Sequence, residues 1–164
     1  MGSLRVMLDT NIYGFIVEEE NPELILESIA NSNVLICGSK VVRDELRKIP
    51  SNRTKGAKKL RNDVLRFYNI LVKDKRNYEV NKLIKELAEE YQKSYKRKGK
   101  NQDLKNDFLI VATASIHQVK IVCSNDEKTM KSKTALKVYS EVNSKFQLQK
   151  PEFISLKKFK QLIK

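Results

Sequence analysis

LRVMLDTNI, residues 4–12, is a short apolar run that ends in a single carboxylate, Asp9. An apolar run of this length predicts a buried strand. Asp9 would then lie where open α/β sheets bind their ligands, in the crevice beyond the carboxyl ends of the strands. Thr10 and Asn11 follow, and residues of all three types cap free N–H groups at helix starts. Alone, the stretch favours a structural cap, whereas other acids in the same setting would favour a binding site.

Further apolar runs at 34–37, 119–123 and 153–154 predict additional strands, and segments with helical spacing separate them. Strands that alternate with helices are typical of a parallel sheet covered on both faces. Within residues 54–98, two amphipathic segments predict an antiparallel helical hairpin inserted into this fold. We therefore expect one domain over residues 1–164, with three α/β/α layers and a mostly parallel central sheet.

Composition narrows the class of protein. The chain has 164 residues, 40% of them hydrophobic, which is enough for one domain with a real core. No run approaches the roughly 18 apolar residues of a membrane helix, and no signal-peptide pattern is present. Cys37 and Cys123 each end an apolar run, which predicts buried thiols in a reducing, cytoplasmic compartment. With His117 as the single histidine, a Cys/His zinc site has too few ligands.

Charge is unevenly distributed along the chain. Lys and Arg number 33 against 20 acids, for a net charge of +13. Residues 47–61 contain seven basic side chains and no acid, and residues 128–164 contain ten lysines against two acids. Such a surface attracts polyanions, of which nucleic acid is the commonest. Lysine-rich surfaces also accompany life at high temperature, so charge alone leaves the partner open.

Three further acids share the apolar setting of Asp9. Asp126 follows the strand at 119–123, Asp107 opens an apolar helical segment, and Glu45 borders the apolar stripe of another helix. In a parallel sheet these positions lie at the same edge, so the four acids are expected to converge. Carboxylates about 6 Å apart repel by roughly 3 kcal/mol per pair at an effective dielectric of 20. Such a cluster must take up protons or a cation.

An all-oxygen ligand set without His or Cys selects Mg²⁺ or Mn²⁺. A carboxylate-bound metal beside a basic surface suggests hydrolysis of phosphodiester bonds, because the metal activates water and offsets negative charge. The alternative from the same residues is an RNA-binding protein without catalysis. It predicts salt-sensitive RNA binding and no metal binding.

Three segments, MLDTNI (7–12), VVRDEL (41–46) and DFLIVATASIHQVKIVCSND (107–126), resemble the PIN domain nucleases, and among them the VapC-type toxin ribonucleases. The resemblance implies a parallel sheet with flanking helices and Mg²⁺- or Mn²⁺-dependent cleavage of RNA. It assigns the family's metal-binding acids to Asp9, Glu45, Asp107 and Asp126. Ser124 matches the family's Ser/Thr, which helps to position the acids and a bound water.

The resemblance also implies partners, namely RNA, an antitoxin protein and a second copy of the chain. The sequence departs from the commonest toxin pattern in two places. The motif at Ser124 is one residue longer, and residues 47–102 are longer and more basic than in a minimal toxin. A non-catalytic PIN-like scaffold for RNA processing is therefore the second interpretation. Neighbouring acids that are able to replace or support the assigned ones are Asp44, Asp103 and Glu127.

Overall fold

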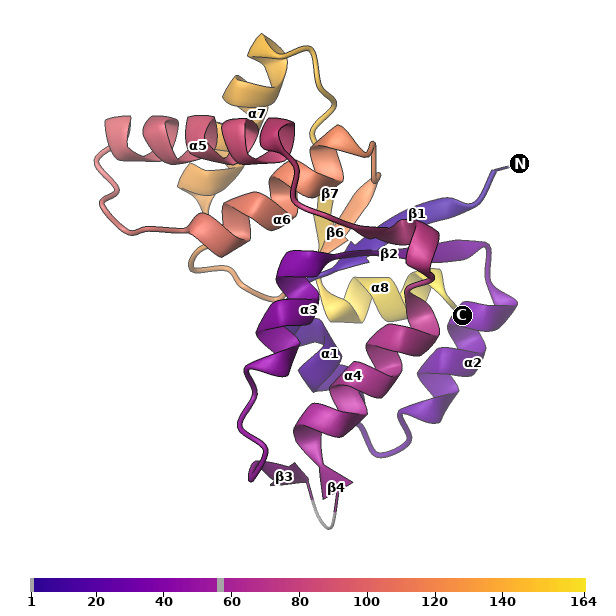
Figure 1. Cartoon of the computed structure of the whole chain (residues 1–164). Helices are drawn as coiled ribbons and strands as arrows, with labels where there is room; N and C mark the ends of the chain where they lie inside the picture. The colour runs from indigo at the N-terminus through magenta and orange to yellow at the C-terminus, as the bar shows by residue number, and fades with distance from the viewer. Residues whose placement is uncertain (1, 56–57) are drawn as a thin grey trace.

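The computed structural model describes residues 2–55 and 58–164 (Figure 1). Its centre is a five-stranded sheet in the order β5-β2-β1-β6-β7, in which every neighbouring pair is parallel. The strands are β1 (Leu4–Leu8), β2 (Val34–Ser39), β5 (Asn77–Tyr78), β6 (Ile121–Cys123) and β7 (Glu152–Ile154). The predicted parallel sheet is confirmed, and β5 is an additional edge strand that the apolar pattern did not predict.

The first strand lies in the middle of the sheet. Val6, Met7 and Leu8 are at most 1% exposed, because helices cover both faces and leave no face for solvent. In register, Leu8 pairs with Cys123 of β6, and Met7 pairs with Cys37 of β2. Both cysteines are buried free thiols, as predicted.

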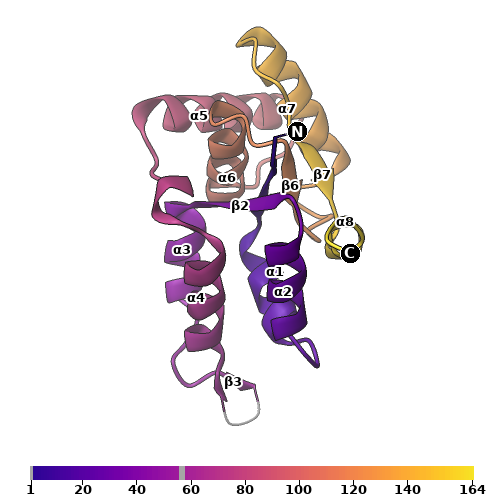
Figure 2. The same cartoon turned by 90° about the vertical axis from the view of Figure 1, so that its right-hand side faces the viewer.

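Helices form a layer on each side of the sheet (Figures 1 and 2). On one side lie α1 (Thr10–Val17), α2 (Glu23–Asn31), α3 (Lys40–Arg47), α4 (Leu60–Leu71) and α8 (Leu156–Leu162). On the other lie α5 (Lys82–Arg97), α6 (Lys105–Ile116) and α7 (Lys133–Lys145). The short elements are an antiparallel pair, β3 (Thr54–Lys55) with β4 (Lys58–Lys59), and a 3₁₀ turn, η1 (Asp74–Arg76). The predicted three-layer α/β/α fold is confirmed.

The predicted hairpin within residues 54–98 is wrong as a packing arrangement, although both of its helices form. Helix α4 packs against α1 and α3, whereas α5 packs against α6 and α7 on the opposite side of the sheet. Strand β5 separates the two helices and takes the chain across the sheet edge. Each apolar stripe is therefore buried against a different layer. Residues 56 and 57 of this range, and residue 1 of the predicted domain, lie outside the described residues.

The strand order changes direction at β1 and β6. From β1 the chain moves outward through β2 to β5, and from β6 it moves the other way to β7. Open α/β sheets bind ligands at such a switch point, beyond the carboxyl ends of the strands. The backbone N–H of Asp9 donates to the carbonyl of Cys123 at 2.9 Å, which joins the two strand ends there. Across the described ranges, no helix has the length and apolar character needed to cross a membrane.

Candidate functional site

Asp9 occupies the switch point directly after β1. Its Oδ1 accepts a hydrogen bond from the N–H of Thr10 at 2.7 Å, and its Oδ2 accepts one from the Ser124 hydroxyl at 2.8 Å. The carboxylate caps helix α1, so Asp9 has the capping role that the sequence suggested for the Asp-Thr-Asn stretch. The residue is only 5% exposed. Asp9 is thus both a helix cap and a buried acid, and the two interpretations of the sequence are compatible.

The surroundings of Asp9 oppose its ionisation. The pKa of Asp9 is raised from 3.8 to about 6, chiefly by burial and in smaller part by repulsion from the nearby carboxylates of Asp107 and Glu45. The hydrogen bonds from Ser124 and Thr10 act in the opposite direction but do not offset the burial. Near neutral pH a buried anion therefore faces two other carboxyl groups, and a cation would stabilise all three.

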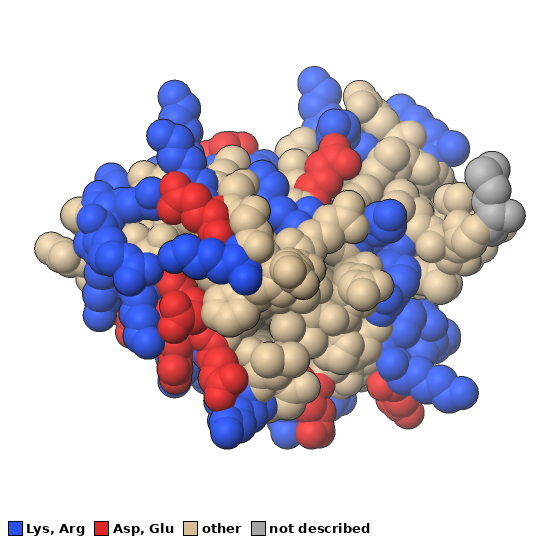
Figure 3. Space-filling model, turned by 90° about the horizontal axis from the view of Figure 1, so that it is seen from above, with Lys and Arg blue, Asp and Glu red and all other residues tan. Residues whose placement is uncertain are grey.

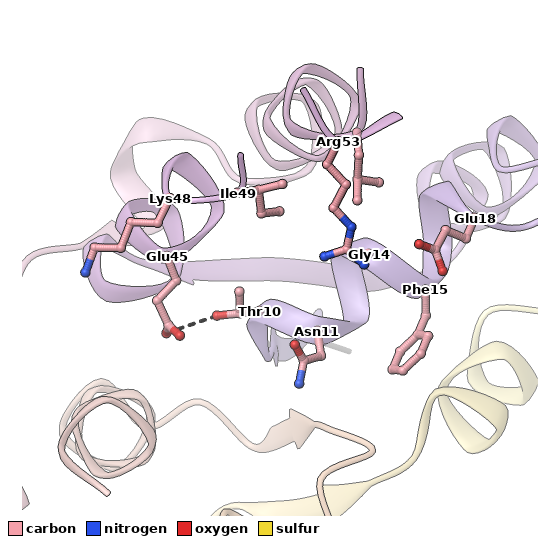
Figure 4. A pocket seen from close by; sticks show the side chains of 10 residues that line it. Thr10, Asn11, Gly14, Phe15, Glu18, Glu45, Lys48, Ile49 and Arg53 are labelled. Carbon is pink, nitrogen blue, oxygen red and sulfur yellow. Dashed lines mark hydrogen bonds between the residues drawn. The ribbon is translucent and has the colours of Figure 1, made fainter. Parts of the chain in front are cut away.

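Glu45 projects from α3 toward the same place. The hydroxyl of Thr10 donates to Oε1 of Glu45 at 3.1 Å, which links the start of α1 to the second turn of α3 (Figure 4). Burial raises the pKa of Glu45, the Thr10 hydrogen bond and Lys48 lower it, and Asp107 raises it. The borderline position of Glu45 on its helix, inferred from the apolar stripe, corresponds to this half-buried setting.

Asp107 and Asp126 share a single hydroxyl. Asp107 lies in the first turn of α6, and Asp126 lies in the turn after β6. The Thr129 hydroxyl donates to Oδ2 of Asp107 at 2.7 Å and also contacts Oδ2 of Asp126. Burial raises the pKa of Asp107, and the neighbouring Asp126 adds to that effect. Thr129 therefore lies between two acids that would otherwise repel each other.

Asp126 differs from the other three acids because backbone groups solvate its charge. Its Oδ1 accepts hydrogen bonds from the N–H groups of Lys128 at 3.0 Å and Thr129 at 2.9 Å. Burial by itself would raise the pKa of Asp126, but these bonds and the Thr129 hydroxyl outweigh it and lower the pKa. The N–H of Asp126 donates to the Ser124 hydroxyl at 3.0 Å, so Ser124 connects this acid to Asp9.

The four predicted acids and Ser124 thus meet at one edge of the sheet, linked by three hydroxyls. Two of these, on Thr10 and Thr129, were not predicted as parts of the site. Their signal in the sequence is a hydroxyl one residue after Asp9 and three residues after Asp126, which is weak without the fold. The alternative acids have partners of their own, although Asp103 also lines a hollow together with Asp107 and Asp126. Asp44 pairs with Arg47, Glu127 pairs with Lys131, and Asp103 accepts from the N–H of Lys105.

His117 lies away from these acids. It ends α6, and its ring stacks on that of Tyr78, with centroids 3.7 Å apart. Its carbonyl accepts a hydrogen bond from Arg5 at 2.7 Å. Burial lowers the pKa of His117, and the charge of Arg5 lowers it further. The contacts of His117 with Tyr78 and Arg5 join the end of α6 to β5 and β1.

Two hollows flank the carboxylates. One, of about 530 Å³, is lined by Thr10 and Glu45 and extends between α1 and α3 (Figure 4). The other, of about 360 Å³, is lined by Asp107, Asp126 and Thr129. The acids are thus accessible from two sides, although Asp9 itself is buried.

The donor set suits a hard divalent cation, because it consists of carboxylate and hydroxyl oxygens. Within residues 2–55 and 58–164, however, no three Asp, Glu, His or Cys side chains are arranged to hold an ion. Hydroxyls of Thr10, Ser124 and Thr129 each donate to one of the carboxylates, and an ionised carboxylate has further lone pairs that are able to bind a cation. Ligation of one ion by three of these acids therefore requires small movements of their side chains.

Comparison with known proteins agrees with this architecture. The PIN domain family model matches residues 6–135. The structure of VapBC2 from Rickettsia felis bound to a promoter DNA fragment is similar, with a TM-score of 0.61 and 19% identity, over 93% of this chain and 98% of that chain. FitAcB from Neisseria gonorrhoeae has a TM-score of 0.56 and 19% identity over 91% and 96% of the two chains.

A third similar structure is VapBC-1 from nontypeable Haemophilus influenzae, with a TM-score of 0.54 and 16% identity over 93% and 98% of the two chains. No curated protein matches by sequence. At these identities the structures establish the fold, and the family model covers most of the sequence, including Asp9, Glu45, Asp107 and Asp126. The chain belongs to the PIN domain family.

Proposed function

We propose that this chain is a Mg²⁺- or Mn²⁺-dependent endoribonuclease that hydrolyses phosphodiester bonds of RNA. The observation that carries the proposal is the burial of Asp9 opposite Asp107 and Glu45. Charged forms of buried acids are disfavoured both by desolvation and by one another, and a divalent cation offsets both costs. Binding of a divalent cation would therefore stabilise the charged forms of these acids, which favours a metal site here.

The four acids have separate roles in this proposal. Asp9, Asp107 and Asp126 hold the metal, and Glu45 either joins them or orients the attacking water. When bound, the metal lowers the pKa of water and offsets the charge that develops on the phosphate. Ser124 holds Asp9 and Asp126 in position through its two hydrogen bonds. Thr10 orients Glu45 in the same way.

RNA is the proposed substrate because the chain resembles the VapC-type toxin ribonucleases, and the charge of the chain supports this choice. A net charge of +13 attracts polyanions over the whole surface, which increases the rate of encounter with nucleic acid. The similar structures are VapBC and FitAcB. By this likeness we propose that the chain is the toxin of a toxin–antitoxin pair, forms a homodimer and acts in the cytoplasm. An adjacent reading frame for a small antitoxin would support the toxin assignment.

Cleavage by Asp9→Asn tests the proposed chemistry. With Mg²⁺ or Mn²⁺, the wild-type protein should cleave RNA, and the variant should be at least about 100-fold slower. That loss is expected because even residues that only support metal ligands contribute about 10- to 100-fold. Asp74→Asn, an exposed acid in η1, is the matched control and should retain full activity. Equal cleavage rates for Asp9→Asn and wild type would refute the assignment.

A non-catalytic RNA-binding scaffold is the second candidate. It is favoured by the hydroxyl bridges, which satisfy the acids without a cation. Calorimetric titration with Mn²⁺ separates the two functions. The nuclease should bind Mn²⁺ and lose most of this binding in Asp9→Asn, whereas the scaffold should bind RNA in a salt-sensitive manner without binding Mn²⁺.

A further inference from the structure

A groove leads away from the acids between two helices. It begins at Thr10 and Glu45, passes Gly14 and Phe15 of α1, and reaches Arg53 on the far side (Figure 4). Its volume is about 530 Å³, which is within the range of pockets that hold small organic groups. The groove therefore connects the proposed reaction centre to a surface on which more of a substrate is able to lie.

Phe15 is the unusual residue of this groove. Its neighbours Ile12, Tyr13 and Ile16 are fully buried, whereas Phe15 is 45% exposed. Figure 4 shows the ring extending from α1 rather than turned into the core. The adjacent Gly14 has no atom within 4 Å of the position that a Cβ would take, so space remains open beside the helix. An aromatic face is thus available for contact with another flat group.

Two basic side chains line the same groove as Phe15. Lys48 ends α3 and Arg53 precedes β3, and both line the groove. In Figure 4, Arg53 extends toward Gly14, and Lys48 lies beside Glu45. One acid, Glu18, also lines the groove near Phe15. Lys48 and Arg53 belong to residues 47–61, the stretch with seven basic residues and no acid. An exposed aromatic ring in a groove that also holds cationic side chains is a combination with which proteins bind single-stranded nucleic acid.

Positive charge alone does not single out the groove. Figure 3 shows Lys and Arg side chains around the face on the side of α5 and α7, with smaller groups of acids between them. Binding driven only by charge would therefore spread over the molecule. The groove differs because it joins an aromatic face, two cations and the acids of the site along one path.

We propose that the groove is a subsite for single-stranded RNA, in which one base stacks on Phe15, and Lys48 and Arg53 bind phosphates on the side of that base that leads toward Glu45. The inference rests on the proposed ribonuclease function and adds the form of its substrate. Bases of an RNA duplex are stacked on one another and do not offer a face to Phe15. The groove should therefore prefer an unpaired segment.

Fluorescence binding measurements test the stacking. The chain contains no tryptophan, so a single-stranded RNA that carries 2-aminopurine gives a fluorescence signal with little contribution from the protein. In an Asp9→Asn background, which prevents cleavage, binding should quench that base. Phe15→Leu should weaken RNA affinity by about 10-fold, near the lower end for loss of one stacked base, and should abolish the quenching. Phe15→Trp should retain both.

Phe146→Leu is the matched control, because Phe146 is also 52% exposed but lies at the end of α7, outside the groove. It should change neither affinity nor quenching. Arg53→Gln should reduce the slope of log affinity against log salt by about one, as expected for one phosphate contact.

Several results would overturn the subsite. These are unchanged RNA affinity and quenching in Phe15→Leu, equal affinity for duplex RNA, or no RNA binding by the wild-type protein. If Phe15→Leu instead weakens binding of a partner peptide and leaves RNA binding intact, the groove is a protein-docking site. Failure of the subsite is distinguishable from failure of the nuclease. If only the subsite proposal is wrong, the wild-type protein still cleaves RNA. If the nuclease proposal is wrong, the RNA-binding signals persist without any cleavage.

Discussion

Asp9 and Asp126 follow neighbouring parallel strands, yet their surroundings act on them in opposite ways. Burial and neighbouring acids raise the pKa of Asp9 to about 6. Burial also disfavours the charged form of Asp126, but hydrogen bonds from backbone N–H groups and from the Thr129 hydroxyl outweigh it and lower the pKa. One strand end holds an acid that ionises reluctantly, and the other holds an acid that is stable as an anion.

The comparison shows that position after a strand does not determine the state of an acid. Asp126 lies in a turn whose N–H groups point at its carboxylate, so its charge is solvated by the protein. Asp9 has one N–H and one hydroxyl, and otherwise faces a dry core and like charges. The surroundings of Asp126 therefore favour its charged form, whereas ionisation of Asp9 depends on what binds there.

The largest expected effect concerns the stability of the metal-free protein. The pKa of Asp9 is raised from 3.8 to about 6, so between these pH values the folded state holds more protons than the unfolded chain. The free energy of unfolding should therefore fall as pH rises through this window, by about 3 kcal/mol from Asp9 alone. Asp9→Asn should remove that fall and be the more stable protein at pH 7.

Urea unfolding of both proteins in chelator, from pH 4 to pH 7, measures this difference. Asp74→Asn should follow the wild-type curve, because Asp74 is exposed in η1. If the free energy of unfolding depends on pH in the same way for wild type and Asp9→Asn, the pKa of Asp9 is not raised and the contrast with Asp126 is lost.

The hydroxyl between Asp107 and Asp126 provides the next test. Thr129→Val keeps the shape of the side chain but removes the donor that contacts both carboxylates. We expect Mn²⁺ affinity to fall by about 10-fold, as for other residues that orient metal ligands. Thr129→Ser should restore it, and calorimetry at pH 7 measures both variants. Equal weakening by Ser and Val would mean that Thr129 contributes by packing rather than by its hydroxyl.

The smallest expected effect is on the turn after β6. Asp126→Ala removes the acceptor of two backbone N–H groups, so the free energy of unfolding should fall by about 1 kcal/mol, as for a lost helix cap. Asp126→Ala is thus expected to destabilise the protein, whereas Asp9→Asn is expected to stabilise it at pH 7. Thermal unfolding in chelator measures it, and a stabilised Asp126→Ala would remove the contrast between the two acids.

The sequence predicts some of these features because they are local. An apolar run followed by an acid marks both β1 with Asp9 and β6 with Asp126, and parallel strands necessarily place those ends together. Glu45 was identified in the same way, from its place beside an apolar stripe. These predictions depend on local sequence patterns and not on the packing partners of the helices.

Features that depend on packing were not predictable. The stripes of α4 and α5 indicate burial but not the partner, so a local hairpin was expected where the helices occupy opposite layers. Strand β5 has only two residues, Asn77 and Tyr78, and is defined by pairing with β2. The contact of Thr129 with Asp107 spans 22 residues and follows no period in the sequence.

The edges of the sheet have a consequence for assembly. Its outermost strands, β5 and β7, are two and three residues long. Short edges offer few free backbone groups to a strand from another molecule, which protects a protein against edge-to-edge aggregation. Helices α5 and α7 lie at the outside of the molecule (Figure 2). Growth of the sheet by addition of strands is therefore disfavoured, and copies or partners of this chain should associate through side chains of its helices.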